Sequence, residues 1–213
     1  MHVFYLHGFA SSAQSKKAAY LAERFREHGL GLRCPDFNEP DFATLTLTRM
    51  LDQIDAELAM LDAQPVVLIG SSLGGVVALH MAARRPDRVD RLVLMAPALL
   101  FGKDGHAFLG PERVAQWRDR RTLDVFHYGY GEARPLDYGF YEDSLRYDAR
   151  SADVTQPVLL FQGLHDAAVP HAVNEQYAAM HPNVTLRLLD DDHQLIASLP
   201  AMWSEMSAFL SLT

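Results

Sequence analysis

A serine flanked by glycines is the residue best suited to covalent chemistry. Residues 70–74 read Gly-Ser-Ser-Leu-Gly, which fits the G-x-S-x-G pattern of a strand-to-helix turn with Ser72 at its centre. Glycines are needed on both sides because the sharp turn strains the serine and brings neighbouring backbone close. Ser71 cannot be the central residue, since its flanking positions would be Ile69 and Leu73. The sequence therefore predicts Ser72 as a nucleophile at the end of a strand.

A serine hydroxyl is a weak nucleophile, so it needs a general base and a third group that orients the base. In the fold that carries this motif, the chain order is serine, acid, histidine. Asp166 follows an apolar run at 157–162, and His193 follows another apolar run at 184–189. We therefore expect His193 to accept the proton of Ser72 while Asp166 holds the imidazole.

Other histidines and acids compete for these two roles. The other nine histidines fall mostly on predicted helices, at strand starts or in a long insertion, which is typical of surface or structural imidazoles. Three aspartates at 190–192 directly precede His193, a run more typical of a solvated, helix-capping cluster. His165, Asp166 and His171 could instead bind a metal, but no HExxH pattern or further well-spaced ligand accompanies them. We therefore expect no metal.

Acyl transfer also needs backbone N–H groups that hold the developing oxyanion, each worth about 3 kcal/mol of barrier. We assign one to Leu73, which follows the serine, and the second to Phe9, in the loop after the first predicted strand. The glycine-containing segments 29–31 and 129–131 lack the third glycine of a dinucleotide fingerprint. We therefore expect no cofactor.

Alternating apolar strands and amphipathic helices must position these residues. Strands are predicted at 3–6, 30–34, 66–69, 89–95, 157–162 and 184–189, and helices at 11–28, 44–61, 72–84, 172–180 and 194–210. The alternation predicts a three-layer α/β/α sandwich around a mostly parallel, doubly wound sheet of about six strands. Ligands of such sheets bind at the carboxyl ends of the strands, where the predicted catalytic residues lie.

The segment 101–150 interrupts this alternation. It is rich in aromatic residues, is far longer than an ordinary connection and contains no convincing strand, although a helix is predicted at 107–121. Its aromatic residues could pack the insertion onto the domain, cover a pocket for an apolar acyl group as a lid, or form a dimer surface. Because no repeat or linker marks a second unit, we expect residues 1–213 to form a single domain.

Composition excludes several classes of protein. The chain has 213 residues, of which 49% are hydrophobic and 22% charged, an ordinary globular mixture. A net charge of −8 without any basic run argues against a nucleic-acid partner. The uncharged stretch 63–83 is broken by Pro65, by the glycine-serine turn and by His80, so we expect no membrane span. One cysteine, Cys34, and no recognisable secretion signal indicate a cytoplasmic protein.

The opening residues and the serine turn resemble the small esterase-like YqiA group of the α/β-hydrolase superfamily. The HGF-x-SS and S-x-KA patterns of that group appear at 7–12 and 15–18, and GSSLGG follows at 70–75; Ala13 stands where the group has proline. The resemblance covers the chain from end to end. It implies an α/β-hydrolase fold that lacks the first two strands of larger members. The triad that it implies is Ser72, Asp166 and His193.

These observations predict a carboxylesterase-like serine hydrolase that cleaves small carboxylic esters or thioesters through an acyl-enzyme, without metal or organic cofactor. Two alternatives remain: a carbon–carbon bond hydrolase or lyase with the same triad, and a non-catalytic binding module that uses the pocket as a receptor. A haloalkane dehalogenase is disfavoured, because serine stands where that chemistry needs a carboxylate. The insertion is more aromatic than the resemblance implies, and the physiological substrate and the oligomeric state stay open.

Overall fold

A parallel sheet of six strands, in the order β2-β1-β3-β4-β7-β8, forms the centre of the protein. The computed structural model describes residues 1–102 and 109–212. The strands of this sheet are β1 (His2–Leu6), β2 (Leu32–Arg33), β3 (Val66–Ser71), β4 (Val89–Met95), β7 (Val158–Gly163) and β8 (Val184–Leu189). All five pairings between them are parallel, which confirms the predicted strand count and direction.

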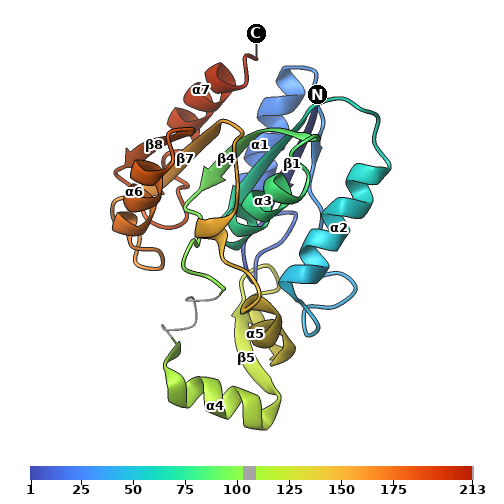
Figure 1. The fold of residues 1–213 in the computed structure, drawn as a ribbon, viewed down its shortest axis with the longest axis vertical. Helices are drawn as coiled ribbons and strands as arrows, with labels where there is room; N and C mark the ends of the chain where they lie inside the picture. Colours follow the sequence, from blue (N-terminus) through green and yellow to red (C-terminus); the bar gives the residue numbers. More distant parts are fainter. Residues whose placement is uncertain (103–108, 213) are drawn as a thin grey trace.

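Helices cover both faces of the sheet (Figure 1). One face packs against α2 (Leu47–Ala59), α3 (Leu73–Arg84) and α6 (His171–Met180), and the other against α1 (Lys16–Glu27) and α7 (Leu199–Phe209). The strands alternate accordingly, so Phe4 and Leu6 of β1 enter the first core while Val3 and Tyr5 enter the second. Because both faces are buried, the central strands are mostly apolar; the exceptions include Asp90 and Arg91 near the start of β4 and Gln162 near the end of β7. The predicted three-layer sandwich is confirmed.

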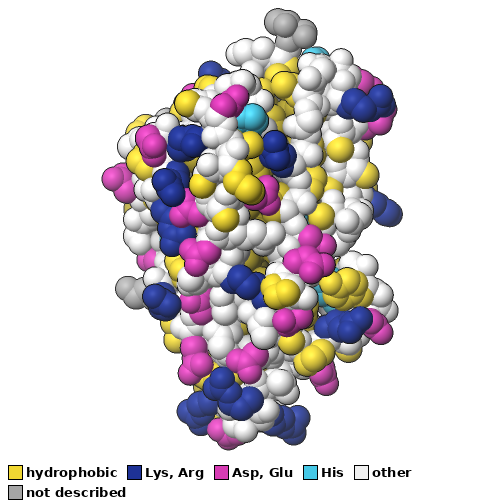
Figure 2. Space-filling model, turned by 90° about the vertical axis from the view of Figure 1, so that its right-hand side faces the viewer, with side chains coloured by type: hydrophobic (Ala, Val, Ile, Leu, Met, Phe, Trp, Pro, Cys, Tyr) yellow, Lys and Arg dark blue, Asp and Glu magenta, His cyan; other side chains and the backbone are white. Residues whose placement is uncertain are grey.

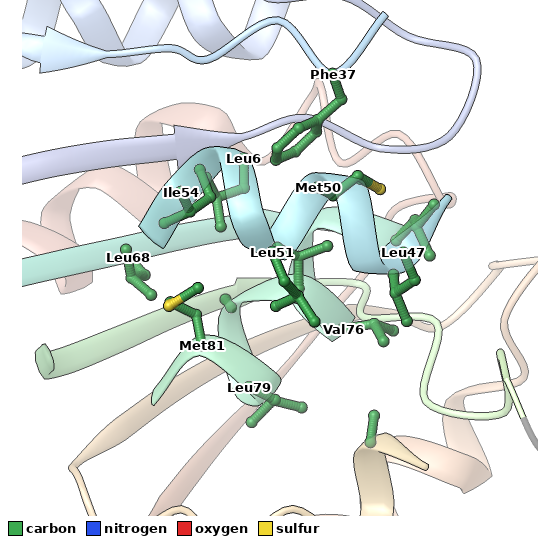
Figure 3. Close-up of a cluster of buried hydrophobic side chains, with 14 of the residues drawn as sticks. Leu6, Phe37, Leu47, Met50, Leu51, Ile54, Leu68, Val76, Leu79 and Met81 are labelled. Carbon is green, nitrogen blue, oxygen red and sulfur yellow. The ribbon is translucent and has the colours of Figure 1, made fainter. Parts of the chain in front are cut away.

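The core beneath α2 illustrates how the sequence pattern fixes a helix. Leu47, Leu51 and Ile54 recur at spacings of four and three residues, so they share one face of α2. Figure 3 shows these side chains among Leu68 of β3 and Val76 of α3. Complete burial of one such side chain stabilises the fold by about 2 kcal/mol.

The segment between β4 and β7 leaves the sheet at the carboxyl ends of the strands and extends beyond it, at the bottom of Figure 1. It contains α4 (Pro111–Arg120), an antiparallel hairpin of β5 (Thr122–His127) and β6 (Glu132–Asp137), α5 (Gly139–Ser144) and a short 3-10 helix (Ala149–Ser151). The prediction of no strand in 101–150 is therefore wrong. The sequence does not indicate the hairpin because both of its strands are largely exposed and therefore lack an apolar run. In addition, β6 contains Pro135, which only an edge strand accommodates.

The predicted helix 107–121 is present as α4, although Ala107 and Phe108 lie outside the described residues. Trp117 of α4 is buried, and its indole Nε1 donates a hydrogen bond to Leu136 O at 3.0 Å. The arginines of α4 are exposed, and Lys and Arg side chains gather at the lower tip of the molecule in Figure 2. Helix α4 thus turns its apolar side toward the hairpin and the cavity that Trp117 lines, and its charged side outward.

The helix predicted at 194–210 begins later, at Leu199. The residues before it form turns that side chains of the aspartate run stabilise. Asp192 Oδ1 accepts a hydrogen bond from Gln194 N–H at 2.7 Å, and Asp191 Oδ2 accepts one from Ser198 N–H at 2.8 Å. No helix among the described residues is long and apolar enough to cross a membrane.

Candidate active site

Ser72 lies in the turn between β3 and α3, with a φ of 52°. This left-handed conformation is strained for a serine, so the surroundings must hold it. Ser72 N–H donates to Met95 O at 2.9 Å, and Ser72 O accepts hydrogen bonds from Gly75 N–H at 2.9 Å and Ala98 N–H at 3.2 Å. The turn is therefore fixed by backbone contacts with β4 and the segment after it.

Two glycines allow this turn to form. A Cβ added to Gly70 would lie 2.3 Å from Gly74 O, and a Cβ added to Gly74 would lie 2.0 Å from Leu6 O. Both distances are far below any tolerated contact, so only glycine permits β1, β3 and α3 to approach this closely. The neighbouring Ser71 is the last residue of β3 and is buried.

The structure brings the three predicted side chains together from three strand ends. His193 Nε2 lies 3.1 Å from Ser72 Oγ, and His193 Nδ1 lies 2.7 Å from Asp166 Oδ2. Both distances fall within hydrogen-bond range, the geometry that a serine nucleophile and its base require. Because Nδ1 faces a carboxylate, it carries the proton, and Nε2 is left to accept the proton of the serine hydroxyl.

The Asp166 carboxylate is buried but well supplied with donors. Its Oδ1 accepts hydrogen bonds from Ala168 N–H at 2.8 Å and Val169 N–H at 2.7 Å, while Gln162 Nε2 donates to Oδ2 at 3.0 Å. Burial alone would raise the pKa of Asp166, but the hydrogen bonds from His193, Val169 and Gln162 lower it below its ordinary value. Asp166 is therefore an anion that can stabilise an imidazolium.

Sequence reasoning missed two buried amides behind Asp166. Gln162 is inaccessible to solvent, and its Oε1 accepts a hydrogen bond from Asn174 Nδ2 at 2.5 Å. Asn174 is equally buried, and its Nδ2 also donates to Pro97 O at 3.3 Å. One signal was available, because a glutamine at the end of an apolar strand must find buried partners. Its partners, however, depend on the tertiary structure.

The loop that carries His193 packs closely on the end of β7. A Cβ added to Gly163 would lie 2.5 Å from both Asp191 O and Asp192 O. From the other side, Lys17 Nζ of α1 donates to Gln194 O at 3.0 Å. Lys17 is buried, which lowers its pKa to about 8 although nearby aspartates oppose this shift. The aspartate run thus shapes this loop, while Asp166 contacts the imidazole.

The two predicted oxyanion donors border the same space. Leu73 is the first residue of α3, so its N–H has no acceptor within the helix. Phe9 lies in the loop after β1, and both residues line the cavity that contains Ser72. A Cβ added to Gly8 would lie 3.9 Å from Ser72 Oγ, so this loop passes beside the hydroxyl. The oxyanion role of Phe9 and Leu73 stays a prediction.

A cavity of about 830 Å³ opens at Ser72 and His193. Much of its wall comes from apolar side chains of the insertion, namely Trp117, Leu123, Val125, Phe126, Leu136 and Phe140. Among the described residues of the lining, Arg113 and Asp124 are charged, and both are exposed. A cavity of this size and character suits an apolar group of a small organic molecule.

His165 and His171 each pair with an acidic side chain other than Asp166. His165 Nε2 is 2.6 Å from Asp190 Oδ1, and His171 Nδ1 is 3.3 Å from Glu175 Oε2. Within residues 1–102 and 109–212, no group of three or more His, Cys, Asp or Glu side chains is arranged to hold a metal ion.

Relatives with curated names include esterases and a lipase. The chain is 53% identical over 49 residues to lipase LipV of Mycobacterium tuberculosis, covering 22% of this chain and 19% of that protein. A pimeloyl-[acyl-carrier protein] methyl ester esterase of Pectobacterium carotovorum is 32% identical, covering 56% of this chain and 46% of the esterase. The match to mouse palmitoyl-protein thioesterase ABHD10 is 26% identical and covers 91% of this chain and 69% of that protein. The chain thus spans less than half the length of the first two relatives, and the matches support a hydrolase.

Solved structures show the fold. Mouse α/β-hydrolase domain-containing protein 10 superposes with a TM-score of 0.82 at 22% identity, covering 99% of this chain and 89% of that chain. Est1E of Butyrivibrio proteoclasticus, solved with ferulic acid, gives 0.84 at 22% identity, covering 98% and 87%. The family match runs over residues 2–210. The chain therefore belongs to the uncharacterised protein family UPF0227 and has the α/β-hydrolase fold.

Proposed function

We propose that this protein is a serine hydrolase that cleaves small carboxylic esters or thioesters through an acyl-enzyme. The observation that carries the proposal is the unbroken hydrogen-bonded chain from Asp166 through His193 to Ser72, whose hydroxyl borders an apolar cavity. The esterase, lipase and thioesterase names of the relatives support the same class of reaction.

The geometry suits the two-step mechanism of acyl transfer. Ser72 Oγ attacks the carbonyl carbon of the substrate while His193 Nε2 takes its proton, and Asp166 stabilises the imidazolium. The N–H groups of Phe9 and Leu73 bind the oxyanion. His193 then gives the proton to the departing alcohol or thiol, and a water molecule activated by the same imidazole releases the acid. Every proton is carried by His193, so the steps balance without a cofactor.

In the proposed enzyme, residues 1–213 form one domain, and the insertion forms a lid-like wall of its cavity. Its apolar side chains line the cavity together with Ser72 and His193, as a wall that contacts the acyl group must. The wall also lowers the local dielectric around the reacting groups, which strengthens electrostatic stabilisation of the oxyanion. The acyl group is accordingly apolar.

The decisive experiment is labelling with a fluorophosphonate, followed by intact and peptide mass spectrometry. We expect one adduct per chain on Ser72 and none after His193→Ala, because the reagent attacks only a serine that its base activates. A panel of esters, thioesters and β-diketones then separates ester cleavage from carbon–carbon cleavage. Lack of any adduct on the wild-type protein, despite access for so small a reagent, would overturn the proposal in favour of a binding module.

A further inference from the structure

A buried histidine of the insertion makes a hydrogen bond with the sheet domain. His127, the last residue of β5, is inaccessible to solvent. Its Nδ1 accepts a hydrogen bond from Tyr130 N–H at 3.2 Å, so the proton of the neutral ring lies on Nε2. Nε2 donates to Asn38 Oδ1 at 2.9 Å. Burial lowers the pKa of His127, which keeps the ring neutral as this pattern requires.

Asn38 extends this chain to the loop after β1. Asn38 Nδ2 donates to Ser11 O at 2.9 Å and to Asp36 Oδ1 at 2.8 Å. Both nitrogens of His127, the amide oxygen of Asn38 and both of its amide protons therefore have partners. A buried polar group is stabilising only when it is satisfied in this way, and such a network fixes one arrangement of its neighbours.

The hairpin also touches the loop after β1 directly. Gly129 N–H lies 3.4 Å from Ala10 O, and a Cβ added to Gly129 would lie 3.0 Å from Ser12 Cβ and 3.2 Å from Ser11 O. The turn of the hairpin therefore packs against the backbone of residues 10–12. No side chain larger than glycine fits between them without a shift.

The segment that carries Asn38 also contacts the start of the loop after β1. His7 Nε2 accepts a hydrogen bond from Phe37 N–H at 3.0 Å, and His7 Nδ1 donates to Gly8 O at 2.9 Å. The Phe9 ring packs between Phe42 at 5.6 Å and Phe140 at 5.2 Å, measured between ring centroids. Phe9 thus lies in a loop that the 36–38 segment holds at both ends.

We propose that the β5–β6 hairpin positions the Phe9 N–H for the oxyanion, and that His127 and Asn38 are the positioning residues through which it does so. This inference rests on the proposed function, because it concerns the oxyanion donor of that reaction. Oxyanion donors stabilise the transition state only when they are held at the site of the developing charge, and a displacement of about 1 Å can cost about 100-fold in rate. The insertion is then part of the catalytic machinery as well as a cover.

The test compares variants that break the link with one that retains it. His127→Ala and Asn38→Ala each remove the hydrogen bond between His127 of the hairpin and Asn38, while the amide of His127→Gln can still donate to Asn38. Tyr128→Ala is the matched control, because Tyr128 is an exposed residue of the same hairpin turn. Ester hydrolysis gives kcat and KM for each variant, and fluorophosphonate titration of Ser72 gives the number of active sites by which kcat is divided.

For His127→Ala and Asn38→Ala we expect kcat per titrated site to fall at least about tenfold with KM changed less than about threefold. The double variant should lose no more than the stronger single variant, because both break one link. His127→Gln should recover most of kcat, and Tyr128→Ala should match wild type.

A purely structural role would lower the number of titrated sites and leave kcat per site intact, which would overturn the inference. Additive losses in the double variant would also overturn it. If His127→Ala does not fold, Asn38→Ala and His127→Gln decide the matter alone. Failure of the proposed function is distinguishable, since the wild-type protein would then show neither turnover nor an adduct on Ser72.

Discussion

The turn that carries Ser72 and the insertion that walls the cavity are held in place by different means. Around Ser72, backbone meets backbone, and Gly70 and Gly74 leave no room for even a methyl group. The insertion has backbone contacts as well, at Gly129 and Asp137, but it relies more on side chains: Thr48 Oγ1 donates to Asp143 Oδ1 at 2.6 Å, and His127 Nε2 donates to Asn38 Oδ1 at 2.9 Å. The proposed nucleophile is thus attached to the sheet, whose geometry allows little change.

This difference implies that the two regions respond differently to substitution. Backbone contacts cannot be repaired by a neighbouring side chain, so a change in the serine turn affects the fold and the reaction together. Side-chain contacts can be exchanged for others of similar shape. The apolar side chains that line the cavity can therefore vary, and with them the preferred acyl group, as long as the contacts of the hairpin at His127 and Gly129 are kept. Variants in each region test this comparison.

The largest effect is expected from the nucleophile itself. Ser72→Ala should lower kcat for ester hydrolysis by about 10⁴-fold or more, because no neighbouring hydroxyl occupies its position in the turn. Ser71→Ala is the matched control, since it deletes the adjacent, buried serine of β3. Steady-state turnover of both variants measures the effect, and unchanged turnover of Ser72→Ala would refute the assignment.

The next largest effect tests the backbone contacts. In Gly74→Ala the new Cβ would lie 2.0 Å from Leu6 O, a backbone atom at the carboxyl end of β1. We expect the free energy of unfolding to fall by at least about 3 kcal/mol, as in severe overpacking. Gly31→Ala provides the control, because a Cβ there has no atom within 4 Å and should change stability by less than about 0.5 kcal/mol. Denaturant unfolding of both proteins gives the comparison, which equal stabilities would contradict.

The same contrast explains what could be predicted from sequence. The four central strands could be predicted because burial on both faces produces apolar runs, and Asp166 and His193 could be predicted because each follows the end of a predicted strand. The long helix predicted at 194–210 was too long, because only the folded chain shows that Asp191 and Asp192 form turns there.

The insertion was less predictable because its strands need no apolar run. Residues 129–131 lack the third glycine of a dinucleotide fingerprint. They lie instead in the turn of the β5–β6 hairpin, where Gly131 has a φ of 72°. Gln162, Asn174 and His127 escaped for a related reason. Each is a buried polar residue with a partner on another element or loop, so its role appears only in the folded chain.

Not every contact on the sheet side is made by the backbone. The side chain of Lys17 helps to hold the loop that carries His193. Burial lowers its pKa from 10.5 to about 8, so between these values the unfolded chain binds more protons than the folded one. The contribution of Lys17 to the free energy of unfolding should therefore rise as pH increases through this window, by about 3 kcal/mol at most. In Lys17→Met this contribution is absent. Denaturant unfolding at several pH values measures the difference between the two proteins.

Lys16→Met serves as the charge control, because it removes the same positive charge from an exposed position of α1. If the curve of Lys17→Met rises with pH as steeply as that of wild type, the amine of Lys17 is not responsible for the slope. The variant also leaves Gln194 O without its donor, which should cost about 1 kcal/mol at every pH and so does not alter the slope.

The smallest effect is expected from Trp117→Phe, which keeps an aromatic ring in the cavity wall but removes the hydrogen bond to Leu136 O. The free energy of unfolding should fall by about 1 kcal/mol. KM for esters with bulky acyl groups should change a few-fold while kcat stays near wild type, because the indole is remote from the proton transfers at His193. Trp203→Phe, on the opposite face of the sheet, should change neither constant. A loss of kcat in Trp117→Phe would show instead that the wall and the catalytic groups are mechanically coupled at α4 as well as through the hairpin.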